Sequence, residues 1–191
     1  MQKWHLDSLI NIYCTQDLRS PWLVGLHDMT TGSLVCGGTL VASRYVVTAA
    51  SCVQARTAWD LYAVLGPGHR GLETQRGVAR IHVHEGYSPE QPTLSAAAVL
   101  ELVREVELAS HTPACVDTNP GPDLELRGAV YQLQGWAGAG AGGGIAEYGV
   151  TGVNSSCKGK EGNTGVMCAG EQRSEVCQVI VNLNIFSKNN V

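Results

Sequence analysis

The sequence has few aromatic residues, few charges and no long apolar run. Among its 191 residues, 6% are aromatic, with a single Phe, and 16% are charged. Apolar runs such as 45–50 and 96–100 are far shorter than the ~20 residues of a membrane-spanning helix, so we expect no membrane insertion. The net charge of -4 gives no basic field for phosphates, which argues against nucleic acid as a partner.

The sequence also lacks the common patterns of metal-binding sites and of targeting segments. No Cys-x-x-Cys pair occurs among the seven cysteines, which disfavours zinc. His82 and His84 share a strand face and could hold a metal with Glu85, but exposed histidines are the favoured interpretation. No signal peptide is visible, because 1–13 has no continuous apolar stretch and no cleavage site follows it. We expect no metal and no other cofactor.

What the sequence does contain is 44% hydrophobic residues and 23 glycines, arranged as short apolar runs between turn residues. Several runs alternate apolar and polar side chains, which is typical of half-buried strands. Gly37-Gly38 and 42–44 punctuate the first of them and suggest antiparallel pairing. The predicted strands are 33–36, 39–41, 45–48, 59–64, 78–84 and 129–136.

Two segments do not follow the strand pattern. Residues 94–109 are rich in Ala, Leu and Glu and, taken alone, predict a helix, although their hydrophobic period is ambiguous. Residues 137–144 consist of Gly and Ala and predict a flexible surface loop.

The segment CGGTLVASRYVVTAASC at 36–52 resembles the stretch of trypsin- and chymotrypsin-like serine proteases that runs from the first disulfide cysteine to the catalytic histidine. Further similar motifs follow in the family's order and extend the resemblance over about 21–178. They are PWLVGL at 21–26, VLG at 64–66, GY at 86–87, GW at 135–136, MCAG at 167–170 and CQ at 177–178.

This resemblance implies an all-β protein of two antiparallel β-barrels with the active site between them. The family's closing strands have no counterpart here, so we expect the second barrel to be incomplete and the chain to be a C-terminally truncated homologue. The β-prone run 179–186 either covers the open sheet edge or promotes aggregation. The predicted organisation is an N-terminal segment of unclear origin at 1–20, a first barrel at 21–109, a partial second barrel at 110–178 and a divergent tail at 179–191.

The resemblance further implies that all three catalytic positions are degenerate. Ser51 stands where the family has its histidine, Ala96 where it has its aspartate, and Val181 where it has its serine nucleophile. A serine hydroxyl cannot serve as a base near neutral pH, and a methyl group orients nothing. We therefore expect no enzyme activity.

The cysteines match the family's disulfide positions in part. The resemblance implies a Cys36–Cys52 bridge, a Cys157–Cys168 bridge and a third pair of Cys14 with Cys115, and it leaves Cys177 over. Asn154 begins a glycosylation sequon, which matters only if the protein is secreted.

The functional prediction is an inactive serine protease homologue, secreted, that acts as a binding or regulatory module for a protein partner or an active protease. The alternative is a serine-type endopeptidase, seen as an aberrant or truncated isoform. A third interpretation is a truncated isoform with no independent function.

Overall fold

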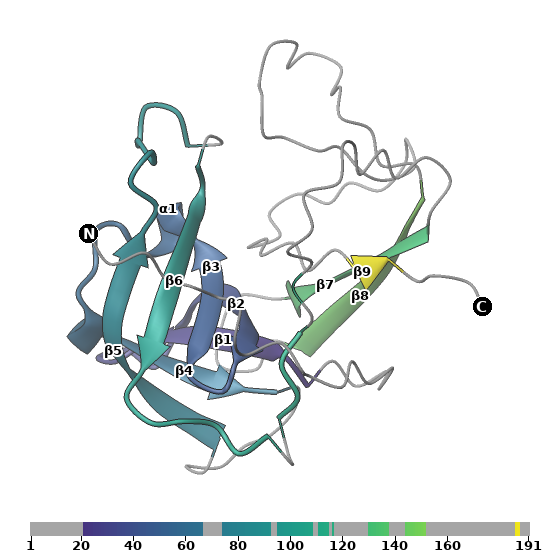
Figure 1. The fold of residues 1–191 in the computed structure, drawn as a ribbon, viewed down its shortest axis with the longest axis horizontal. Coiled ribbons are helices and arrows are strands. Elements are labelled where there is room, and N and C mark those ends of the chain that lie inside the picture. The colour runs from purple at the N-terminus through teal and green to yellow at the C-terminus, as the bar shows by residue number, and fades with distance from the viewer. Residues whose placement is uncertain are drawn as a thin grey trace.

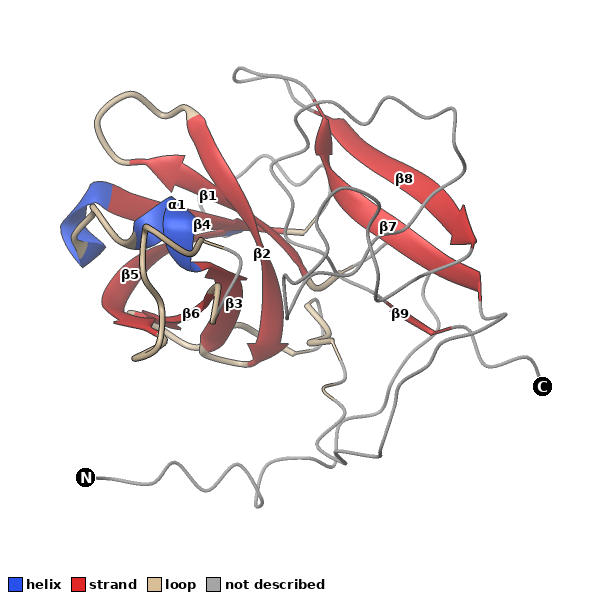
Figure 2. Ribbon diagram, turned by 90° about the horizontal axis from the view of Figure 1, so that it is seen from above, coloured by secondary structure: helices blue, strands red, loops and turns tan. Residues whose placement is uncertain are grey.

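The computed structural model describes residues 21–66, 74–92, 95–108, 111–114 and 116, and the strand backbone at 130–137, 144–151 and 186–187. In this part of the chain, strands dominate and the helical segments are short (Figure 2). The barrel strands are β1 (Leu23–Asp28), β2 (Leu34–Ala42), β3 (Tyr45–Ala49), β4 (Leu61–Leu65), β5 (Gln75–Val83) and β6 (Ala97–Leu102). The helical segments are α1 (Ala50–Val53) and the 3₁₀ turn η1 (Ala58–Asp60).

The strands β1 to β6 form a closed antiparallel barrel in the order β1-β2-β3-β6-β5-β4 (Figure 1). Closure comes from β1, which pairs with β2 on one side and with β4 on the other. This barrel confirms the prediction of an all-β fold of the trypsin type. The completeness of a second barrel and the domain limits at 109 and 178 stay predictions.

Buried side chains from the barrel strands fill the interior, and β4 and β6 show how alternate residues of a strand face inward. In β4 the buried residues are Leu61, Ala63 and Leu65, and in β6 the residues Leu100 and Leu102 are fully buried in the same core. This period of two is the pattern expected when one face of a strand packs inward. The apolar alternation in the sequence therefore builds the core directly.

The glycine pair in the second strand does not interrupt it, contrary to the prediction of two brief strands at 33–36 and 39–41. Residues 34–42 form one strand, which includes Gly37 and Gly38. A Cβ atom at Gly38 would lie 2.6 Å from Cγ1 of Val46. Glycine is needed here for the close approach of β3, so it serves packing and not a turn.

The helix predicted for 94–109 was wrong, because its central part is strand β6. This strand pairs with β3 and β5, so both its edges are hydrogen-bonded within the sheet. Its outward-facing Glu101 is only 9% exposed and lies between the guanidinium groups of Arg44 and Arg80, at 3.3 and 3.5 Å. Tertiary pairing thus outweighs the helix propensity of Ala, Leu and Glu.

The strand predicted for 59–64 begins later than the alternation suggested. Residues 58–60 form η1, and strand pairing starts at Leu61. Thr57 and Asp60 bond reciprocally around this turn, which draws the chain out of the extended conformation. Trp59 consequently lies outside the strand.

A second sheet contains β7 (Val130–Ala137), β8 (Gly144–Thr151) and β9 (Phe186–Ser187) in the order β8-β7-β9. The strand predicted at 129–136 is confirmed by β7, which pairs along its whole length with β8. The segment predicted as a divergent tail contributes strand β9 to this sheet, where Phe186 lies opposite Gln132 of β7. Residues 138–143 of the predicted loop lie outside the described residues.

Candidate functional site

Strand β3 leads directly into the short helix α1, which carries Ser51. The chain is extended at Ala49 and turns into the helix at Ala50, which is fully buried. Ser51 is exposed, and the next residue, Cys52, packs partly against the barrel core. The helix therefore holds one side chain out to solvent while its neighbours anchor it to the barrel.

The start of β6 lies directly beside α1. The amide of Ala50 donates a hydrogen bond to the carbonyl oxygen of Ala96 over 2.8 Å, and Ala49 lies opposite Ala97 in the sheet register. Two positions far apart in the sequence, Ser51 and Ala96, are thus brought to the same end of the β3–β6 pair. The assignment of these two residues to the family's histidine and aspartate positions stays a prediction.

An imidazole also comes to this end of the barrel, from the turn directly after β5. The amide of His84 donates to the carbonyl oxygen of Ala97 over 3.0 Å. Its Nδ1 accepts the amide hydrogen of Gly86 at 3.0 Å, so that nitrogen already has a partner within the turn. His84 is exposed and serves to shape this turn.

The disulfide between Cys36 and Cys52 is confirmed. It joins β2 to α1 with a Cα–Cα distance of 6.2 Å across 16 residues of sequence. This separation lies in the range that disulfides span. The bond ties the helix that carries Ser51 to the barrel wall.

The remaining predicted site residues lie outside the described residues and stay predictions. These are Val181 at the nucleophile position, Cys14, Cys115, Cys157, Cys168 and Cys177, and the sequon residue Asn154.

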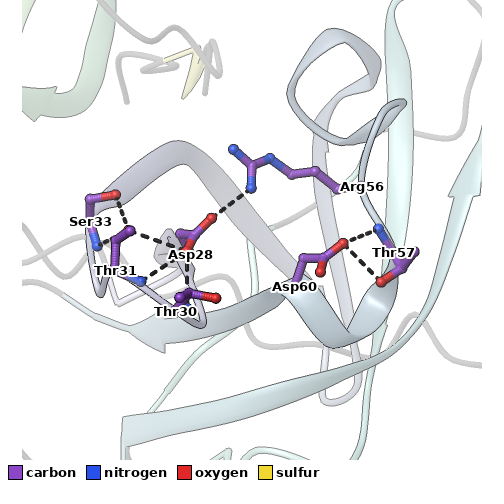
Figure 3. A network of polar contacts seen from close by, with 7 residues as sticks. All are labelled: Asp28, Thr30, Thr31, Ser33, Arg56, Thr57 and Asp60. Atoms are coloured by element: carbon purple, nitrogen blue, oxygen red, sulfur yellow. Dashed lines mark hydrogen bonds and ion pairs between the residues drawn. The ribbon is translucent and has the colours of Figure 1, made fainter.

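Sequence reasoning missed a polar network that joins the β1–β2 turn to the segment before β4 (Figure 3). Asp28 accepts hydrogen bonds from the amides of Thr30 and Thr31 at 3.0 and 2.9 Å. The same carboxylate pairs with the Arg56 guanidinium at 2.9 Å.

The second part of the network surrounds Asp60. Thr57 donates from its amide and its hydroxyl to Oδ2 of Asp60 at 2.7 and 2.8 Å. The spacing T-x-x-D at 57–60 was the signal available in the sequence.

These contacts favour the charged form of Asp28. The amide of Thr31, the Arg56 guanidinium and the amide of Thr30 lower the pKa of its carboxyl to about 2. Because the pKa of Asp28 is lower in the folded state, its contribution to stability is full above the unfolded value near 4 and is lost as the pH falls toward 2. The pKa of Asp60 is also lowered, chiefly by the Thr57 amide.

We expect the Asp28 carboxyl to titrate with a midpoint near 2, measured from its ¹³C chemical shift. In an Arg56→Gln variant this midpoint should rise, since the second-largest cause of the lowered pKa is removed. Asp28→Asn should flatten the fall in the free energy of unfolding between pH 4 and 2. A wild-type midpoint at 3.8 would show that the network does not form in solution.

Within the part of the chain that the structure describes, no group of three or more His, Cys, Asp or Glu side chains could hold a metal ion. His82 and His84 lie exposed on or just after β5. In the same described ranges, no helix is long and apolar enough to cross a membrane.

Comparison with known sequences agrees with the barrel and with the positions of its motifs. The sequence model of the trypsin family matches residues 10–178, which is most of the chain. The chain belongs to the trypsin family. Its β1–β6 barrel, with the disulfide next to Ser51, lies wholly within the matched region.

Three relatives within the trypsin family illustrate its range. The chain is 28% identical over 112 residues to the inactive serine protease scarface of Drosophila melanogaster. It is 34% identical over 136 residues to the serine protease filzig of the same fly, and 31% identical over 126 residues to trypsin alpha-4 of Lucilia cuprina. These matches cover 55%, 65% and 65% of this chain.

The chain corresponds to a limited part of each of these trypsin-family relatives. The matches span 17% of scarface, 8% of filzig and 47% of trypsin alpha-4. One of these relatives is named an inactive serine protease, and the others are named a serine protease and a trypsin. Membership of the family therefore does not decide whether this chain is catalytically active.

Proposed function

We propose that this protein is a non-catalytic member of the trypsin family, a pseudo-protease that acts as a secreted binding or regulatory module. The observation that carries the proposal is the hydrogen bond from the amide of Ala50 to the carbonyl of Ala96. This bond joins the segments that carry Ser51 and Ala96, and we infer that these residues stand at the positions where catalysis in this family needs an imidazole and a carboxylate.

The chemistry of these side chains supports inertness. A serine nucleophile needs a general base that accepts its proton. The Ser51 hydroxyl cannot act as that base, because it does not accept a proton near neutral pH. The Ala96 methyl group can neither orient nor stabilise an imidazolium. His84 does not replace the base, because its Nδ1 is bonded to Gly86. The third position, Val181, has no atom able to attack a carbonyl.

The secreted location is supported by the Cys36–Cys52 disulfide, since such bonds persist in oxidising compartments. The same proposal includes two further bridges, Cys157–Cys168 and Cys14–Cys115, and glycosylation of Asn154. A module that keeps the barrel but not the catalytic groups retains a surface on which a protein partner or an active protease can bind. The name of the relative scarface, an inactive serine protease, agrees with this type of function.

We expect the purified chain to leave trypsin-type ester substrates and fluorophosphonate probes unchanged. Loss of an interdependent catalytic unit costs about 10⁶-fold in rate. A Ser51→His/Ala96→Asp variant should remain at buffer background, because it restores a base and an acid without a nucleophile. The measurement is ester turnover and probe labelling, with active trypsin assayed in parallel.

A Ser51→Ala variant controls for labelling of the Ser51 hydroxyl itself. Turnover by the unmodified chain would overturn the pseudo-protease proposal and favour the alternative, a serine-type endopeptidase. Turnover by the Ser51→His/Ala96→Asp variant alone would show that another residue occupies the nucleophile position.

A further inference from the structure

We draw no further inference here: the strongest candidate, the exposed surface row of Arg80, His82 and His84 on β5 and just after it, carries nothing, because nothing in the described part of the chain shows what covers it and the carboxylate of Glu101 already pairs with Arg80.

Discussion

Replacing Leu100 by alanine is expected to lower the free energy of unfolding of the barrel by about 3–5 kcal/mol. Leu100 is fully buried in the core cluster, and its strand β6 lies between β3 and β5. Removing its side chain therefore leaves a cavity lined from several strands, which the paired backbone cannot collapse to fill. The measurement is denaturant-dependent hydrogen exchange of peptides from 97–102, which reports on the barrel itself.

The matched control is Leu108→Ala, the same chemical change at a side chain that is 51% exposed. Its effect should stay within about 0.5 kcal/mol. Equal losses in the two variants would contradict the burial of Leu100 and with it the register of β6.

Replacing both Cys36 and Cys52 by alanine is expected to lower the free energy of unfolding by about 3 kcal/mol. The bond joins cysteines at a sequence separation of 16, and its removal lets the unfolded chain explore more conformations. The loss also releases α1 from β2, so amides near Ser51 should exchange faster. The measurement is urea unfolding of the oxidised wild type against the double variant.

Reduction of the wild type provides the control for this prediction. The reduced wild type and the reduced double variant should unfold at the same urea concentration, because under reducing conditions neither has any disulfide cross-link. Alkylation of Cys36 in the unreduced protein would show that the bond is absent in solution.

The sequence predicted the barrel well where apolar side chains alternate. The alternation at 59–64 predicted the strand that the structure has as β4, and the motif at 36–52 predicted the disulfide. It failed at β6, where helix-forming residues are held extended by two neighbouring strands. The local sequence does not show which strands will pair with this segment, so its secondary-structure propensity cannot predict the strand.

The site was predictable in the same uneven way. The family motifs assign Ser51 and Ala96 to the histidine and aspartate positions, and that assignment stays a prediction. The structure joins the segments that carry them through the bond between Ala50 and Ala96. The network of Asp28 with Arg56 could not be found, because these residues are far apart in sequence and only the β1–β4 pairing brings their segments together. Trp59 was predicted within a strand, but it lies on η1, the turn around which Thr57 and Asp60 bond, and it is 87% exposed.

The strand order of the barrel also sets how the barrel must assemble. Strands β1-β2-β3 and β4-β5-β6 are two meanders whose internal pairings are local, and they join at two seams, β3 with β6 and β1 with β4. Local hairpins form faster than contacts between distant segments, so seam closure is the slow event in folding. Before closure, each meander has two unpaired edges that can recruit another chain, and the closed barrel has none. We therefore expect aggregation of the barrel to start from molecules in which the β3–β6 and β1–β4 seams have not formed.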